Sequence, residues 1–241
     1  MFLYNLYNQI FSNNYEKSAA DLLKKLNHGK ELYIVDIGSY IGKFSENINN
    51  YFKIKKKFYL IDPNPFIKNK LKLSFDYKFF NLAINNSRSI KTLYFNEAFP
   101  AAGTSLEKYI FSDKKYNLSR KIFFLRKKNL FKKIKVKTKY LDDFCRENKI
   151  HKIDILKIDT EGSEVNIFKS AKKIINSTKI ICVEVMQKKN DSKNNSKIES
   201  IQNLLGKNFL LMYKKKIFSV SILSNIVCYD LIFLNKKYLK R

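Results

Sequence analysis

Three carboxylates follow one apolar run in the segment 154–164, which has the sequence DILKIDTEGSE. The apolar residues of 153–158 are typical of a buried strand, and Asp159, Glu161 and Glu164 crowd the turn where that strand ends. Ligands bind at the carboxyl ends of the strands in an open parallel sheet. Because neighbouring carboxylates repel one another, the cluster indicates a cationic ligand, a metal ion or proton transfer.

The rest of the chain is strongly basic, with 48 Lys and Arg against 21 Asp and Glu and a formal net charge of +27. Such a charge is typical of proteins that bind nucleic acids or membrane surfaces. Only five of the basic residues are arginines, whereas proteins that recognise nucleic acids use arginine for bidentate contacts. The abundance of Lys, Asn, Ile, Phe and Tyr matches the bias of an AT-rich coding sequence. We therefore interpret the charge as background and do not expect nucleic acid to be the partner.

The cellular setting is indicated by three further features. Cys145, Cys182 and Cys228 are widely spaced and form no CxxC pattern, which argues against a zinc site or a disulfide framework. The first residues, MFLYNLYNQIF, carry no leading Lys or Arg and make a poor signal peptide. No segment reaches the roughly 18 uninterrupted apolar residues of a membrane span. These features predict a cytoplasmic protein without a transmembrane segment.

A second candidate site lies in the segment 35–45, VDIGSYIGKFS, where a predicted strand meets a predicted helix. Gly38 and Gly42 would let the backbone turn tightly and approach a ligand. Asp62 ends the next predicted strand, where an acid commonly binds ribose hydroxyls. The pattern D-x-G-x-x-x-G lacks the spacing for pyrophosphate, and Asp36 disfavours an anion, so a cationic nucleoside such as S-adenosylmethionine fits better. Taken singly, the glycines are compatible with an ordinary turn and Asp62 with a helix cap.

Strands and helices are predicted to alternate along most of the chain, which implies right-handed crossovers and a doubly wound, mostly parallel α/β sheet. The last two strands lack an intervening helix, so we expect an antiparallel pair at the sheet edge. One domain is expected, with residues 1–30 as an N-terminal helical extension and residues 97–133 as an insertion or lid. The predicted strands are residues 32–37, 58–61, 79–83, 90–95, 136–138, 153–158, 180–185, 209–213 and 226–234. The predicted helices are residues 18–27, 43–52, 65–73, 141–149, 163–175 and 198–205.

With these residues assembled, the chain closely resembles the FkbM family of S-adenosylmethionine-dependent methyltransferases. The resemblance runs in the family's order over about residues 33–186, and DILKIDTEGSE is its most specific part. The other matching blocks are VDIGSYIGKFS, the Asp62-Pro63 pair, NLAI at 81–84, GTSL at 103–106, TKYLDDF at 138–144 and VEV at 183–185. The chain departs from the family at Ser39 and Tyr40, where alanine and asparagine are usual, and at Asp62, which replaces a glutamate.

The resemblance implies a Rossmann-like class I methyltransferase fold with a seven-stranded sheet. It also implies methyl transfer to an oxygen of a sugar, glycan or related small metabolite, with residues 97–133 on the acceptor side. S-adenosylmethionine is the implied cofactor. Asp62 would bind its ribose, and the turn that contains Asn81 and Ala83 would lie near its adenine. Asp36, Gly38 and Gly42 would hold its methionine part, and Ser39 is a further cofactor-binding candidate.

The acidic turn then belongs to the acceptor side of the site. Methyl transfer to a hydroxyl needs alignment of donor and acceptor and uptake of the acceptor's proton. We expect one of Asp159 and Glu161 to act as general base and the other to orient the acceptor. In a second interpretation, less favoured, these two hold a divalent ion together with Glu184, because hard cations prefer oxygen ligands. Glu164 is interpreted as a cap of the following helix, and Ser105 either contacts a ligand or belongs to a simple turn.

Other classes of function compete with this interpretation. A nucleic-acid methyltransferase or an RNA-binding protein would use the basic surface, although the chain has no NPPY-like motif and no paired arginines. A nicotinamide-dependent enzyme would also need Asp62 but should carry a third glycine in the turn. A degenerate, non-catalytic form of the fold is a further alternative because of Tyr40.

Overall fold

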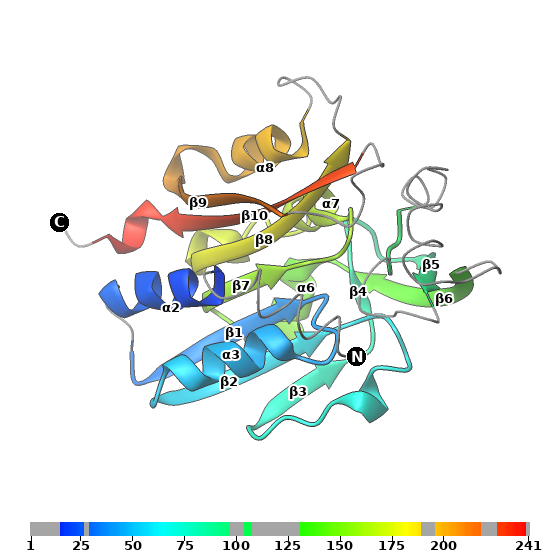
Figure 1. Ribbon diagram of the computed structural model, residues 1–241, viewed down its shortest axis with the longest axis horizontal. Helices are drawn as coiled ribbons and strands as arrows, with labels where there is room; N and C mark the ends of the chain where they lie inside the picture. Colours follow the sequence, from blue (N-terminus) through cyan, green and yellow to red (C-terminus); the bar gives the residue numbers. More distant parts are fainter. Residues whose placement is uncertain are drawn as a thin grey trace.

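The structure, a computed structural model, has a central seven-stranded sheet with helices on both faces (Figure 1). It describes residues 15–26, 29–96, 104–107, 131–188, 196–217 and 226–239. The strands of this sheet are β1 Glu31–Ile37, β2 Lys55–Ile61, β3 Tyr77–Phe80, β7 Ile153–Ile158, β8 Thr178–Lys188, β9 Phe209–Ile217 and β10 Ile226–Asn235. They are arranged in the order β3-β2-β1-β7-β8-β10-β9.

The strand directions confirm the expected doubly wound sheet of the class I methyltransferase fold. Neighbouring strands pair in parallel except at β10, which is antiparallel to both β8 and β9. Residues 218–225 join β9 to β10, and this connection is too short for a crossover, which needs about a dozen residues or more. The winding of the chain reverses between β1 and β7, so the carboxyl ends of these two strands form the topological switch point where ligands bind in such sheets.

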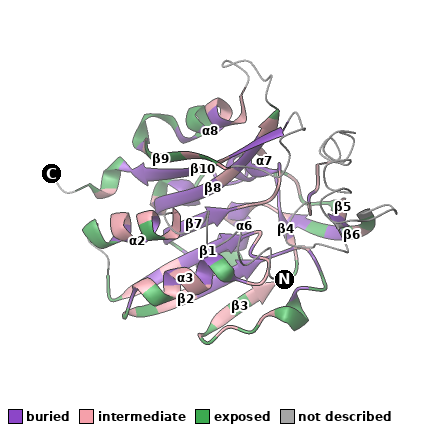
Figure 2. Ribbon diagram, in the orientation of Figure 1, coloured by how far each residue is buried: buried purple, intermediate pink, exposed green. Residues whose placement is uncertain are grey.

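Helices cover the two faces of the sheet as separate layers. On one face lie α2 Tyr15–Lys25 and α3 Lys43–Tyr51. On the other face lie α6 Leu141–Glu147, α7 Glu164–Lys169 and α8 Lys197–Leu205. Figure 2 shows the central strands buried, with exposed residues on the helices and on outer strands such as β9. Short 3-10 turns complete the described elements: η1 Lys68–Lys70, η2 Ile174–Ser177, η4 Gly206–Asn208 and η5 Lys236–Tyr238.

A second, three-stranded sheet stands beside the carboxyl ends of the main strands. It contains β4 Ala83–Ile84, β5 Ile90–Asn96 and β6 Phe131–Lys139, with β6 between the other two. The single strand predicted over 79–83 is therefore wrong. The chain bends after Phe80, where the side-chain amide of Asn81 donates to the carbonyl of Asp62 over 3.0 Å, and β4 then joins the second sheet. β6 is longer than the predicted 136–138 because it pairs antiparallel with the whole of β5.

Two predicted helices are also shorter than expected. The predicted helix over 65–73 is reduced to η1, and the predicted helix over 163–175 ends at Lys169. There the hydroxyl of Ser170 donates to the carbonyl of Ile167 over 2.7 Å and accepts the amide of Leu141 over 3.1 Å. The carboxylate of Asp142 accepts the amides of residues 173 and 174. These bonds to the start of α6 compete with continuation of the helix.

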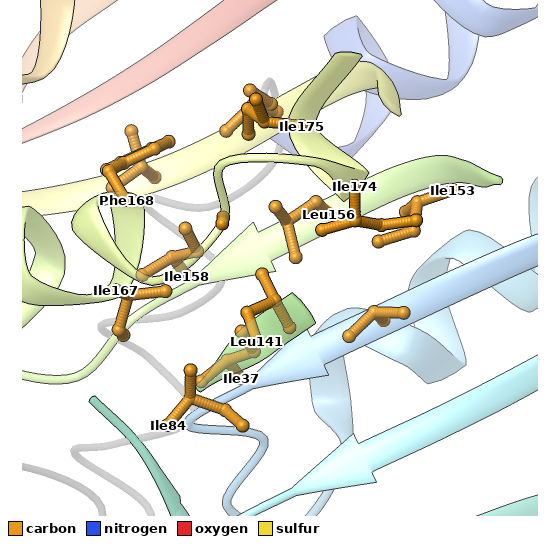
Figure 3. Close-up of a cluster of buried hydrophobic side chains, with 14 of the residues drawn as sticks. Ile37, Ile84, Leu141, Ile153, Leu156, Ile158, Ile167, Phe168, Ile174 and Ile175 are labelled. Atoms are coloured by element: carbon orange, nitrogen blue, oxygen red, sulfur yellow. The ribbon is translucent and has the colours of Figure 1, made fainter. Parts of the chain in front are cut away.

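The apolar core that fixes the site connects the two sheets. Figure 3 shows Ile37 of β1 and Ile158 of β7 packed with Ile84 of β4, Leu141 of α6 and Ile167 of α7. All five side chains are buried. The ends of β1 and β7 are therefore held against the second sheet and the following helices by close-packed aliphatic groups.

Some predicted features lie partly outside the described residues. Of the predicted N-terminal extension, α2 and residues 26, 29 and 30 are described, while residues 1–14, 27 and 28 are not. Of the predicted insertion over 97–133, only residues 104–107 and 131–133 are described. Within the described parts of the chain, no helix is both long and apolar enough to cross a membrane.

Candidate active site

A hollow of about 640 Å³, open solvent included, lies at the carboxyl ends of β1, β2 and β7. Its wall brings together five residues predicted for the site from four separate stretches of sequence. They are Gly38 after β1, Asp62 after β2, Ala83 of β4, and Asp159 and Glu161 after β7. The other predicted residues, Asp36, Ser39, Gly42 and Asn81, lie close to this wall in the chain but do not line the hollow.

The turn after β1 needs glycine for contacts within the protein. Gly38 has φ +75°, and its amide donates to the carbonyl of Ile61 over 2.8 Å. A Cβ at this position would stand 1.7 Å from the carbonyl oxygen of Asp159, so the end of β7 occupies the space that a side chain would take. Gly42 has φ +78° and begins α3, and a Cβ there would meet the side chain of Leu73 at 2.7 Å. Close backbone approach thus serves the packing of β1 against β7.

Asp62 is bound to the neighbouring turn through both of its carboxylate oxygens. One oxygen accepts the amide of Tyr40 and the other accepts the amide of Asn64, each over 2.9 Å. The first bond holds Tyr40 in a left-handed conformation, φ +45°, which an aromatic residue rarely adopts. Burial raises the pKa of Asp62 to about 6. Each oxygen retains a lone pair, so the carboxylate can accept further hydrogen bonds from a ligand.

The side of the hollow that faces β4 is apolar. Leu82, Ala83 and Ile84 line it together with Leu93 of β5. Asn81 is exposed, and its side-chain amide is bound to the carbonyl of Asp62. The predicted turn 81–83 therefore supplies a hydrophobic surface through its last residues, while Asn81 supports the turn after β2.

Lys157 is a functional candidate that the sequence-based prediction missed. It lies in β7, is buried, and its ammonium donates to the carbonyl of Gly38 over 2.9 Å. The same nitrogen lies 3.3 Å from a carboxylate oxygen of Asp36 and 3.2 Å from one of Asp159. Burial opposes the charge on this ammonium, but the carboxylates of Asp159 and Asp36 outweigh it and raise the pKa of Lys157.

Asp36 is therefore bound inside the protein and does not face the hollow. It is fully buried, and the hydroxyl of Ser45 in α3 donates to it over 2.7 Å. One signal in the sequence points to this arrangement: a lysine in the middle of a run predicted to be buried. Lysine is almost never fully buried unless it is paired, so Lys157 required carboxylate partners on the neighbouring strands.

The acidic turn is held in shape by the second sheet. Glu161 has φ +54°, and its carbonyl accepts the hydroxyl of Ser105 over 2.6 Å. Ser105 is in turn paired with Tyr94 of β5 by two backbone hydrogen bonds of 2.9 Å. Ser105 lines the hollow, and its hydroxyl fixes the backbone of the acidic turn.

Glu164 closes the same turn from the other side. Its carboxylate accepts the amide of Gly162 over 2.6 Å and the hydroxyl of Thr160 over 3.2 Å. Burial raises the pKa of Glu164, and the ammonium of Lys197, 3.6 Å away, opposes this shift. Glu164 lies in the first turn of α7, where its charge complements the helix dipole, but the N-cap is Ser163 and no described side chain caps the helix, so the interpretation of Glu164 as a capping residue is wrong in that respect.

The carboxylates beside the hollow extend along the sheet to β8 and β10. Glu184 pairs in register with Asp230 of β10. Burial, followed by the charges of Asp159 and Asp230, raises the pKa of Glu184 well above its usual range. Within the described parts of the chain, no three Asp, Glu, His or Cys side chains converge closely enough to hold a metal ion. The set of Asp159, Glu161 and Glu184 is thus not arranged as a metal site in this structure.

Comparison with known proteins gives one family and several remote structural likenesses. Residues 36–211, more than half of the chain, match the family described as Methyltransferase FkbM domain. No curated protein sequence matches the chain. Precorrin-6y C5,15-methyltransferase from Geobacter metallireducens GS-15 is 10% identical with a TM-score of 0.42, over 91% of this chain and 89% of that chain. TYW2 from P. horikoshii, in complex with MeSAdo, is 11% identical with a TM-score of 0.46, and the match covers 92% of this chain and 62% of that chain. N-methyltransferase NodS from Bradyrhizobium japonicum WM9 is 10% identical with a TM-score of 0.42, and the match covers 92% of this chain and 97% of that chain.

The contact between Gly38 and Asp159 predicts a large loss of stability in Gly38→Ala. The added methyl group would overlap the backbone of the acidic turn, so β1 and β7 must separate locally. Gly206→Ala is the matched control, because Gly206 also has positive φ but no atom within 4 Å of an added Cβ. Backbone strain alone costs about 1–3 kcal/mol. Urea unfolding should show a clearly larger loss for Gly38→Ala, and equal losses would contradict the packing role.

Proposed function

The chain belongs to the FkbM methyltransferase family, and from this membership we propose that it methylates a hydroxyl oxygen of a sugar, a glycan or a related small metabolite. The observation that carries the proposal is the placement of Asp62 and the pair Asp159 and Glu161 on the wall of one hollow. Asp62 is suited to bind a nucleoside, and Asp159 and Glu161 are suited to bind a hydroxyl acceptor. S-adenosylmethionine is the proposed donor.

The chemistry of the wall fits this donor. Carboxylates of Asp62, Asp159 and Glu161 surround the hollow in a chain whose formal net charge is +27, which favours a cation there over an anion. The apolar surface of residues 82–84 suits a flat heterocycle such as adenine. The hydroxyl of Ser39 is buried and makes no hydrogen bond within the described residues, but Ser39 does not line the hollow.

We assign the cofactor-binding residues in two groups. Asp62, Gly38 and Ala83 line the hollow and would contact the cofactor directly. Asp36, Gly42 and Asn81 support them: Asp36 holds Lys157 and Ser45, Gly42 begins α3, and Asn81 holds the carbonyl of Asp62. Ser39 completes the cofactor-binding set.

In the proposed reaction the cofactor supplies an electrophilic methyl group, and the protein handles the acceptor and its proton. A C–O bond forms as the C–S bond breaks, and the hydroxyl proton passes to a carboxylate of the acidic turn. The carboxylate of Asp159 is held by Lys157, which suits it to orient the acceptor. Glu161 then takes the proton, because its backbone is fixed by Ser105 at the same wall. Positioned proton transfer of this kind contributes about 10²–10⁴-fold to the rate.

The remaining parts of the proposal concern the setting. We propose that the chain acts as one methyltransferase domain and that residues 97–133 form an acceptor-side insertion. The three cysteines are buried and are not in disulfide bonds, which suits a reducing cytoplasm. A divalent ion at Asp159 and Glu161 is not part of the proposed mechanism.

Methylation of nucleic acid is the second candidate, supported by a row of exposed lysines on β6. Lys133, Lys135 and Lys137 alternate along the strand and so share one face. The intervening Val136 is buried in a cluster with Ala83 and Leu93, which line the hollow. The lysines therefore face away from the hollow, which weakens this candidate. Salt-sensitive binding of RNA at physiological ionic strength would favour it.

The protein is expected to bind S-adenosylmethionine, and the affinity should fall below about pH 6. Burial raises the pKa of Asp62 to about 6, and protonation removes an acceptor for ribose hydroxyls. Because a single carboxyl group titrates, the affinity for the cofactor should fall on the order of tenfold per pH unit below this pKa. Calorimetry from pH 5 to 8 should show this fall, and Asp62→Asn should bind weakly with no such pH dependence. Asp76→Asn, an exposed aspartate, is the matched control. Absence of heat from wild-type protein with both the cofactor and its demethylated product would contradict the enzyme proposal.

Asp159→Asn and Glu161→Gln should retain cofactor binding but lose turnover, by about 10²–10⁴-fold. Both substitutions preserve shape and remove the charge that orients the acceptor or accepts its proton. The acceptor would first be found by a screen with labelled cofactor against cell-surface glycans and small hydroxylated metabolites. Glu147→Gln, on the exposed side of α6, is the control. Wild-type turnover in both variants would remove the catalytic assignment.

A further inference from the structure

Lys157 is a charged residue at a buried position of the central sheet. It lies in β7, every residue of which is buried, and pairs in register with Asp36 of β1 and Cys182 of β8. The same strand contains a second charged pair, in which Lys179 of β8 lies 2.8 Å from a carboxylate oxygen of Asp154. That pair is three residues away towards the amino end of β7 and does not border the hollow. Comparison of the two pairs therefore distinguishes the effect of a buried charge anywhere in the sheet from the effect of a buried charge beside the hollow.

The ammonium of Lys157 connects the two halves of the proposed site. Its three acceptors belong to different structural units: the carbonyl of Gly38 in the turn after β1, Asp36 within β1, and Asp159 in the acidic turn. A lysine ammonium has three donors, which matches three acceptors arranged around one point. An arginine presents a planar fork instead and does not match this arrangement.

We propose that Lys157 is a positioning residue for methyl transfer, which fixes the turn after β1 and the carboxylate of Asp159 relative to each other. The proposal rests on the proposed function of this hollow. Asp36 is fully buried and bound to Ser45, so its carboxylate cannot turn towards solvent. The side chain of Asp159 is one-third exposed, so without Lys157 the repulsion from Asp36 would turn it towards solvent. Lys157 thus acts on the reaction through Asp159 and through the turn.

The test is a double-mutant cycle between Lys157→Met and Asp159→Asn, with turnover and cofactor affinity as readouts. If Lys157 acts through Asp159, Lys157→Met should lower turnover by about 10²-fold, as expected for a misplaced group. Asp159→Asn should then lower it little further. Independent, multiplicative losses would overturn the proposal, as would wild-type turnover in Lys157→Met.

Cofactor affinity distinguishes positioning from a simple charge effect. A displaced turn weakens binding of S-adenosylmethionine and of its neutral demethylated product by similar factors. Loss of a positive charge alone would instead strengthen binding of the cationic donor and leave the neutral product unaffected, and that result with unchanged turnover would overturn the proposal. Lys179→Met is the matched control, since it removes the other buried lysine of the sheet, and it should leave turnover per folded molecule unchanged.

A neutral double variant covers the case in which Lys157→Met does not fold. Asp36→Asn with Lys157→Met leaves no charge buried between β1 and β7, and the remaining carboxylate of Asp159 is one-third exposed, so the fold is retained while Asp159 loses its anchor. This variant should turn over far more slowly than Asp36→Asn alone, and equal rates would overturn the proposal. Failure of the proposed function gives a different result, because wild-type protein would then bind neither form of the cofactor.

Discussion

The carboxyl edge of this sheet depends on a buried ammonium between two carboxylates. Charges are expensive to bury unless they satisfy one another, and removal of one partner from a buried pair typically costs about 3–5 kcal/mol. Lys157 meets this requirement with Asp36 and Asp159, and it also binds the carbonyl that the positive φ of Gly38 turns towards it. A glycine turn, a buried aspartate and an acidic turn are thus mutually dependent. Replacement of Lys157 by an apolar residue alone would leave the buried Asp36 without its cation and would remove the anchor of Asp159 and of the glycine turn.

The second sheet extends this dependence to the opposite side of the hollow. Ser105 is paired with β5 and binds the carbonyl of Glu161, so the left-handed backbone of the acidic turn is imposed by a strand from elsewhere in the chain. Ala83 and Leu93 of the same sheet supply the apolar wall. The hollow therefore has a rigid polar side and a rigid apolar side, both attached to close-packed cores, which is the condition for holding two reactants in one geometry.

Much of the fold could be predicted from hydrophobic pattern because its strands are fully buried. The strand 153–158 was predicted to the residue, and the antiparallel pair at the sheet edge was predicted from the absence of a crossover. Errors occur where tertiary contacts override local pattern. The helix expected over 163–175 ends at Lys169 because the start of α6 binds the hydroxyl of Ser170, and the strand expected over 79–83 divides because its last residue pairs with β6. The fixing of Asp62 by the amide of Tyr40, a residue that departs from the family pattern, was likewise not predicted.

The alternation of strands and helices, the two turns that carry functional residues and the family could all be inferred from the sequence, because burial pattern and motif spacing are local properties of the chain. The sequence placed Asp62, Asp159 and Glu161 at strand ends, and strand ends of a parallel sheet meet at one edge. Which groups face the hollow and which are bound inside the protein depends on tertiary contacts that the sequence does not reveal. Asp36 and Asp159 are similar aspartates in the sequence, yet the ammonium of Lys157 and the hydroxyl of Ser45 bind the first internally and leave the second at the wall. That difference depends on strand register and on the distance between charges, and both exist only once the sheet has formed.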